Sequence, residues 1–272
     1  MLFASALTSP RLKALAIAAG LTGVAPAVLA QAFDAVRLFG AASGVDGGTA
    51  GVAFIAGTEY PGANERRNLV LPLLDYQWTS GWFAGTSNGV GYEFGKRLDM
   101  QYGLRLTFDR GRDADRSTVL RGMGDIDIKP EVGAFFNYFV SPQVFLTSSL
   151  RFGAGNNGRG MVVDLGAGYA TQLAAQWRMA VGAAVTLANA DYMQSYFGVS
   201  AAQAVASGHP VYTPGAGVRD VRANLSVNYF LTRQVTFTTA LSVSALQGGA
   251  TNSPLTRKST SPTGVFVIGY AF

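Results

Sequence analysis

Few side chains in this sequence could carry out chemistry, and those few occur singly. The chain has no cysteine and one histidine, His209. The lack of cysteine excludes a disulfide framework, a thiol nucleophile and a thiolate metal site, and one histidine argues against a histidine-based metal cluster. His209 with a serine and an aspartate could form a hydrolase triad. It precedes Pro210 in a predicted loop, however, and no predicted strand places a serine and an acid beside it. We therefore expect no catalytic residue, cofactor or metal.

Two charged or glycine-rich segments could bind a phosphate. The segment DRGRDADR, residues 109–116, alternates acids with arginines. Arginine pairs with phosphate through two hydrogen bonds, so this segment could gather a ligand or contact lipopolysaccharide. The favoured alternative is a solvated loop whose charges neutralise each other, because surface ion pairs are individually weak. The segment GAGNNGRG, residues 153–160, joins two predicted strands and opens no helix, so it predicts a tight hairpin turn at 156–158 rather than a phosphate cradle.

The composition indicates an ordered chain with an unusual surface. Hydrophobic residues make up 49% of the chain, which rules out a disordered protein, and glycine occurs 34 times. Charged residues are only 14%, against roughly 25% in typical soluble domains. The net charge of +5 is mild, and no basic stripe with interleaved aromatics is visible, so we expect no nucleic-acid partner.

The N-terminus predicts a secretory signal. Arg11 and Lys13 precede an uncharged stretch at 14–28, and Ala30 offers a cleavage site. We therefore expect a signal peptide at 1–30 and one mature domain at 31–272. The alternative is a membrane-anchoring helix, although 14–30 falls just short of a full span.

Period-two alternation recurs along the mature chain. In LDMQYGLRLTFD, residues 98–109, apolar and aromatic side chains alternate with polar ones, and 221–231 and 234–245 repeat the pattern. Alternate residues of a strand point to opposite faces. The polar faces carry glycine, hydroxyl residues and isolated charges with almost no lysine, which suits a confined interior better than open water. A transmembrane β-barrel, with apolar side chains facing lipid and polar ones facing the lumen, is the predicted fold.

The predicted fold is all-β, an antiparallel up-and-down barrel of twelve strands, with ten as the alternative. The connections at 96–97, 141–142 and 232–233 are tight, whereas 110–129, 189–217 and 247–262 are long, as expected for periplasmic turns and extracellular loops. Counting back from a periplasmic C-terminus makes 48–57 run downward and requires an additional strand before it. The candidate strands are 33–43, 48–57, 68–78, 81–95, 98–109, 130–140, 143–154, 160–171, 175–188, 218–231, 234–246 and 263–272.

Eight charges on the polar faces are predicted to lie in the lumen. Buried charges must be paired or hydrated, so they either interlock across a narrow interior or line a water-filled passage, and interlocking is favoured. These candidate lumen charges are Glu93, Asp99, Arg105, Glu131, Arg151, Asp164, Arg178 and Arg222.

The last strand, TGVFVIGYAF at 263–272, ends on an aromatic residue. Phe266, Ile268, Tyr270 and Phe272 share one face. This arrangement resembles the signal read by the barrel assembly machinery of Gram-negative bacteria. We therefore expect the protein in the outer membrane, in contact with its lipid and lipopolysaccharide.

Several longer segments carry a family resemblance. The region ANADYMQSYFGVSAAQAVASGHPVYTPGAGVRDV resembles the corresponding part of the MipA/OmpV family of outer-membrane proteins. Further matching pieces are EYPG at 59–62, LPLLDYQW at 71–78, LRGMGDID at 120–127 and GGATNSPLT at 248–256. The resemblance covers essentially the whole mature chain, and its most specific parts are 192–199 and Ser253-Pro254.

The resemblance implies an outer-membrane barrel without enzymatic activity. It further implies a scaffolding role that links a murein hydrolase, the lytic transglycosylase, to a penicillin-binding murein synthase. The alternatives are a small-solute diffusion channel and, more remotely, a lipid hydrolase.

Two segments are candidates for contacts with partners. If the scaffold binds through its periplasmic turns, the longest predicted turn, 57–67, offers Tyr60, Glu65, Arg66 and Arg67. In the longest loop, the aromatics Tyr192, Tyr196 and Phe197 could form a partner-binding surface, plug the barrel mouth or join the lipid-interface girdle.

Overall fold

The computed structural model describes residues 46–95, 97 and 99–272. The predicted signal peptide at 1–30 and the candidate strand at 33–43 lie outside these residues. Within the described part of the chain, none of the helices has both the length and the apolar character needed to span a membrane.

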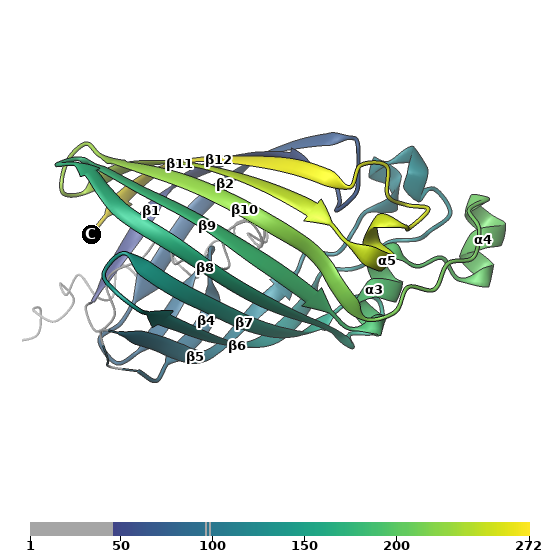
Figure 1. The fold of residues 1–272 in the computed structure, drawn as a ribbon, viewed down its shortest axis with the longest axis horizontal. Coiled ribbons are helices and arrows are strands. Elements are labelled where there is room, and N and C mark those ends of the chain that lie inside the picture. Colours follow the sequence, from purple (N-terminus) through teal and green to yellow (C-terminus); the bar gives the residue numbers. More distant parts are fainter. Residues whose placement is uncertain (1–45, 96, 98) are drawn as a thin grey trace, which may run out of the picture.

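The described chain forms one closed barrel of twelve antiparallel strands (Figure 1). Each strand pairs with the next one in sequence, and the first pairs with the last. The strands are β1 (Gly47–Thr58), β2 (Arg66–Gln77), β3 (Trp82–Gly85), β4 (Gly89–Glu93), β5 (Met100–Asp109), β6 (Lys129–Phe139), β7 (Val144–Ala154), β8 (Gly160–Ala174), β9 (Trp177–Ala188), β10 (Gly217–Phe230), β11 (Val235–Leu246) and β12 (Thr260–Ala271).

The loops carry short helices at one end of the barrel. These are η1 (Ala114–Arg116), η2 (Thr118–Leu120), α3 (Ala190–Phe197), α4 (Ala201–Ser207) and α5 (Gly248–Thr251). Figure 1 shows α3, α4 and α5 together at the end opposite the C-terminus.

The alternation of side chains is inverted relative to a soluble protein. In β5, Leu104, Leu106 and Phe108 are 52%, 44% and 47% exposed, whereas Arg105, Thr107 and Asp109 between them are buried. Large apolar side chains are also exposed on all of the remaining long strands. Exposed apolar surface costs free energy in water and none in hydrocarbon. The predicted transmembrane barrel is confirmed.

The number of strands is as predicted, but one predicted strand is wrong. The segment 81–95 is a short hairpin, β3 and β4, joined by a turn at 86–88. Gly89 permits this turn because its φ is +74°, and a Cβ there would meet the carbonyl oxygen of Leu106 at 2.1 Å. The outward positions keep the same parity on both sides of the turn, with Trp82 and Val90 exposed, so the two strands read as one. The segment TSNG at 86–89 is the turn signal in the sequence. Twelve strands are thus reached without 33–43.

This correction reverses the predicted direction of β1. Gly48 and Phe272 exchange two backbone hydrogen bonds, so β1 starts at the end where the chain terminates. The connections at that end are the short turns 78–81, 94–99, 140–143, 175–176 and 231–234, and the opposite end carries 59–65, 110–128, 155–159, 189–216 and 247–259. The prediction of a periplasmic turn at 57–67 is therefore wrong, since residues 59–65 lie among the long loops. The hairpin turn predicted at 156–158 is confirmed.

The barrel closes where β1 meets β12. Their register runs from Thr49 opposite Ala271 to Ala56 opposite Gly264. Phe266, Ile268, Tyr270 and Phe272 are exposed on the outer face, and their role as an assembly signal stays a prediction. Gly51 allows the two backbones to approach, because a Cβ at Gly51 would lie 2.1 Å from the carbonyl oxygen of Ile268.

We predict that Gly51→Ala weakens the closure. The added methyl group must displace backbone of β12, and such overpacking costs about 1–3 kcal/mol. The measurement is the urea midpoint of the barrel refolded in uncharged detergent, followed by its heat-modifiable mobility on gels.

The matched control is Gly264→Ala on the same seam. A Cβ there would meet only the Leu241 side chain, at 3.7 Å. This variant should stay within about 0.5 kcal/mol of the wild type. Equal stability of the two variants would contradict the role assigned to Gly51.

Candidate functional site

Helix α3 lies inside the mouth of the barrel and is referred to below as the plug. Asn189 caps it by accepting a hydrogen bond from the Tyr192 amide. Because residues three and four apart share a face of a helix, Tyr192, Met193, Tyr196 and Phe197 are buried together. They pack in one cluster with apolar side chains from the strands and loops, among them Ile126, Ala154, Val162, Ala188, Leu246 and Ala250. Of the three predicted positions for Tyr192, Tyr196 and Phe197, the structure has the one folded into the barrel mouth.

The loops above α3 hold one another in place. A second buried cluster joins Tyr60, Leu120, Met123, Val199 and Leu255 from four separate connections. The Tyr60 hydroxyl donates to the Leu255 carbonyl at 3.1 Å. Such contacts tie the loops into a cap over this end of the barrel.

The residues that the sequence predicts for a periplasmic turn belong to this cap and to the adjoining strand β2. Besides Tyr60, Glu65 accepts a hydrogen bond from the Ser117 hydroxyl at 2.8 Å. Arg67 pairs with Glu59 at 3.2 Å, and Arg66 is exposed. Neither end of this segment reaches the short-turn side of the barrel.

Tyr196 joins α3 to the barrel wall. Its hydroxyl donates to the carboxylate of Asp109 at 2.6 Å, and the same carboxylate accepts from the Gly155 amide at 2.9 Å. Burial raises the pKa of the Tyr196 hydroxyl far above its ordinary value, and the neighbouring Tyr192 and Asp109 raise it further. Tyr196 therefore keeps its proton and acts as a hydrogen-bond donor to a buried carboxylate.

A chain of buried ion pairs crosses the interior faces of β6, β7, β8 and β10. Arg151 lies 3.5 Å from Glu131 and 3.1 Å from Asp164. Arg222 pairs with Asp164 and lies 3.3 Å from Asp220. These side chains are 2% to 9% exposed. Charges buried this deeply are tolerated only when paired, so the structure has the interlocking arrangement.

The neighbouring strands extend the polar interior. The Thr186 hydroxyl of β9 donates to Asp164 at 2.7 Å, and Arg105 donates to the Ser149 hydroxyl at 2.7 Å. Glu93 is buried and accepts from Gln77 at 3.4 Å.

Two of the eight predicted lumen charges lie elsewhere. Asp99 sits at the short-turn rim, where Arg97 donates to both of its carboxylate oxygens at 2.8 and 2.7 Å. This pairing lowers the pKa of Asp99 below its ordinary value. Arg178 is exposed at the same end. Both residues have the inward parity of their strands, but they stand where the strands begin and so reach solvent.

Arg219 and Asp220 are buried charges that the alternation pattern does not predict. The two are adjacent, yet both are buried, and Arg219 donates to Asp220 at 2.6 Å and to the Tyr192 hydroxyl at 2.8 Å. A register shift between Val218 and Asp220 turns consecutive residues inward. An alternation rule cannot find a residue placed by a bulge.

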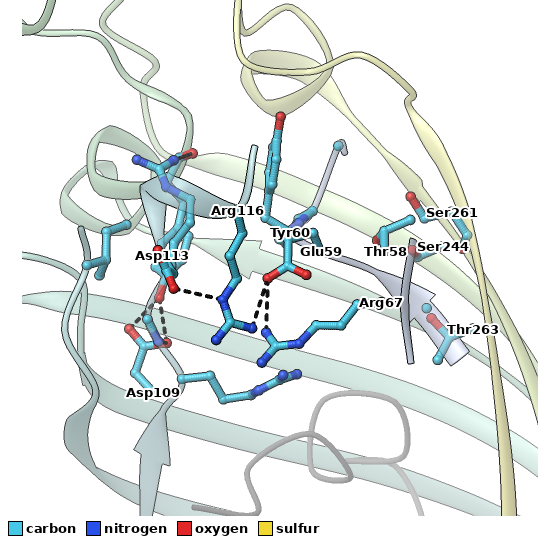
Figure 2. Close-up of a pocket in the computed structure, with 18 of the residues that line it drawn as sticks. Thr58, Glu59, Tyr60, Arg67, Asp109, Asp113, Arg116, Ser244, Ser261 and Thr263 are labelled. Atoms are coloured by element: carbon cyan, nitrogen blue, oxygen red, sulfur yellow. Dashed lines mark hydrogen bonds and ion pairs between the residues drawn. The ribbon is translucent and has the colours of Figure 1, made fainter. Parts of the chain in front are cut away.

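A cavity of about 480 Å³ lies beneath the loop cap, among polar side chains. Figure 2 shows Glu59 between Arg67 and Arg116, with Asp109 across the cavity and the hydroxyls of Ser244, Ser261 and Thr263 at its side. Arg116 also pairs with Asp113 at 2.7 Å, which lowers the pKa of Asp113. Part of DRGRDADR is thus a solvated ion pair, as favoured, whereas Arg110 and Arg112 line the cavity.

No group of three His, Asp or Glu side chains able to hold a metal is found among the described residues. The His209 ring nitrogen Nε2 lies 2.8 Å from the Val119 carbonyl oxygen, which makes a loop contact.

The family model described as MltA-interacting protein MipA matches residues 50–272. The chain belongs to this family. No curated relative matches it. Among solved structures, the chain is similar to a KdgM porin, with a TM-score of 0.46 and 7% identity over 82% of this chain and 99% of that one. It is also similar to the CymD monoaromatic hydrocarbon channel, with a TM-score of 0.45 and 12% identity over 93% and 98% of the two chains.

We predict that Tyr196→Phe destabilises this MipA-family barrel by about 1–3 kcal/mol, because a buried carboxylate loses a hydrogen-bond donor. The measurement is the free energy of unfolding in urea, with the protein in lipid vesicles. Loss of near-ultraviolet circular dichroism would report loosening of α3.

Tyr169→Phe is the matched control. Tyr169 is exposed on the outer face of β8, so loss of its hydroxyl should leave the free energy of unfolding nearly unchanged. If both variants unfold at the same urea concentration, the Tyr196 to Asp109 hydrogen bond does not stabilise the plug.

Proposed function

We propose that this protein is a non-enzymatic outer-membrane barrel with a scaffolding role in the cell envelope. In that role it links a murein hydrolase to a murein synthase of the penicillin-binding type. The observation that supports this most is the filled interior, where α3 and the buried ion pairs occupy space that a transport protein would leave open. The family description, which names interaction with MltA, supports a murein transglycosylase as the partner.

The short-turn end is the surface that would meet periplasmic partners. In barrels of this kind short turns and the chain terminus face the periplasm. Arg178 and Arg233 are exposed at this end and offer cationic contacts to an acidic partner surface. The loop cap lies at the opposite end and is excluded from this contact.

We predict that exchanging both arginines, Arg178→Glu with Arg233→Glu, lowers capture of an MltA-type transglycosylase several-fold. Reversing rim charges slows association with a complementary surface. The measurement is affinity capture from crosslinked envelopes, with the penicillin-binding protein quantified in the same eluate.

The matched control reverses two exposed arginines at the other end, Arg121→Glu with Arg159→Glu. Capture by this variant should equal that of the wild type. A loss confined to the control, or equal capture by both variants, would refute the assignment to the short turns.

A small-solute channel is the second candidate, and the polar cavity beneath the cap favours it. Planar bilayer recordings separate the two functions. We predict no discrete open steps for the wild type, because the buried ion pairs and α3 obstruct the interior. Stable unitary steps in the wild-type protein would favour the channel instead.

A further inference from the structure

Two arginines of the cavity, Arg110 and Arg112, make no direct ion pair with a described carboxylate. Arg112 is 6% exposed, and its Nη1 donates to the Tyr196 carbonyl at 2.8 Å. Its Nε and Nη2 are buried without a hydrogen-bond partner. Arg110 also lines the cavity, and within the described chain its side chain makes no hydrogen bond or ion pair. A buried cationic N–H group without an acceptor is costly. Arg110 is half-buried, so its guanidinium is the one that a ligand in the cavity can reach.

Two of the carboxylates that line the cavity are engaged by other groups. Glu59 is held by Arg67 and Arg116, and Asp109 by Tyr196 and Gly155. Burial lowers the pKa of Arg110 to about 10, and the positive charge of Arg67 contributes to that shift. The Arg110 guanidinium is still charged at neutral pH. The cavity lining carries equal numbers of arginines and carboxylates, but neither Glu59 nor Asp109 forms an ion pair with Arg110.

The barrel wall is interrupted beside this cavity. Because β3 and β4 are short, β2 pairs with β3 only from Asp75 to Gln77, and β5 pairs with β4 only from Gly103 to Leu106. Beyond the hairpin, toward the loop end of the barrel, residues 66–73 of β2 pair with β1 along one edge. Along the other edge they pair with no strand among the described residues. The flanking outward side chains Val70 and Phe108 are exposed and apolar, as at a lipid face.

Residues from both sides of the interruption line the cavity. Arg67 and Leu69 come from β2, and Asp109 and Arg110 come from the end of β5. Figure 2 shows Arg67 and Asp109 on opposite sides of this space. Unpaired strand edges are not tolerated in hydrocarbon, so polar groups of another molecule are required where lipid reaches this edge.

We propose that the cavity binds the anionic head of an amphiphile from the outer leaflet, with the head on Arg110 and Arg112 and the apolar part leaving between β2 and β5. A phosphate or carboxylate matches the fork of a guanidinium. The head also supplies oxygen acceptors next to the unpaired edge of β2. A cavity of about 480 Å³ accommodates a head group together with the start of its tail.

The test uses the full-length mature barrel in an uncharged detergent, with dodecyl phosphate, dodecanol and inorganic phosphate as probes in native mass spectrometry and calorimetry. One dodecyl phosphate per barrel should bind, and dodecanol should not bind at that site. Arg110→Gln should weaken binding of dodecyl phosphate about tenfold or more. Inorganic phosphate should compete only at far higher concentration.

Controls make each result decisive. Arg159→Gln removes an exposed arginine outside the cavity and should leave binding unchanged. Arg112→Gln tests the same site if Arg110→Gln fails to give heat-modifiable, folded protein. Equal binding of dodecanol, or undiminished binding in the folded arginine variants, would overturn the site. Competition by inorganic phosphate at equal concentration would show that a free anion is the ligand and overturn the amphiphile. None of these results depends on the scaffolding role.

Discussion

In hydrocarbon, a strand cannot leave its backbone polar groups unpaired, and the rest of this structure depends on that constraint. It requires the sheet to close, and closure brings β1 against β12 through eight residue pairs. A closed sheet in lipid presents apolar side chains outward and turns the polar ones toward one another. The charges of β6, β7, β8 and β10 therefore meet in a confined interior, where each needs an opposite charge within reach. The inner ion pairs are thus a consequence of closure.

The same constraint explains why the loops are part of the interior. Asp109, at the loop end of β5, is buried, and its carboxylate takes its hydrogen bonds from the loops. Helix α3 supplies the Tyr196 hydroxyl to Asp109, and the Tyr192 hydroxyl accepts from Arg219. The helix in turn buries its apolar face only because the barrel offers the cluster around Val162 and Leu246. Barrel and plug therefore stabilise each other through polar and apolar contacts at once.

The sequence predicts the parts of this arrangement that follow from local periodicity. Alternation at 98–109 correctly separates Leu104 from Arg105, and the lack of lysine on the polar faces predicts a closed interior. The prediction fails where a bulge breaks the periodicity and where the periodicity continues through a turn. The hairpin at Gly89 keeps the parity of the outward side chains while the chain reverses direction, so β1 runs opposite to the predicted direction. The bulge before Asp220 places Arg219 in the interior against the alternation. Contacts such as Tyr196 to Asp109 join residues 87 positions apart, and no local pattern specifies them.

The end of β5 is where the wall, the plug and the cavity meet. Asp109 accepts from Tyr196 of the plug, while the next residue, Arg110, turns into the cavity beside the interrupted wall. An anion on Arg110 would add negative charge close to Asp109 and strengthen the need for the Tyr196 donor. Occupation of the cavity and seating of α3 are therefore expected to be coupled, since the Tyr196 hydrogen bond offsets part of the repulsion between the anion and Asp109. The short hairpin, which opens the wall at this point, is what allows a molecule in the membrane to reach that coupled site.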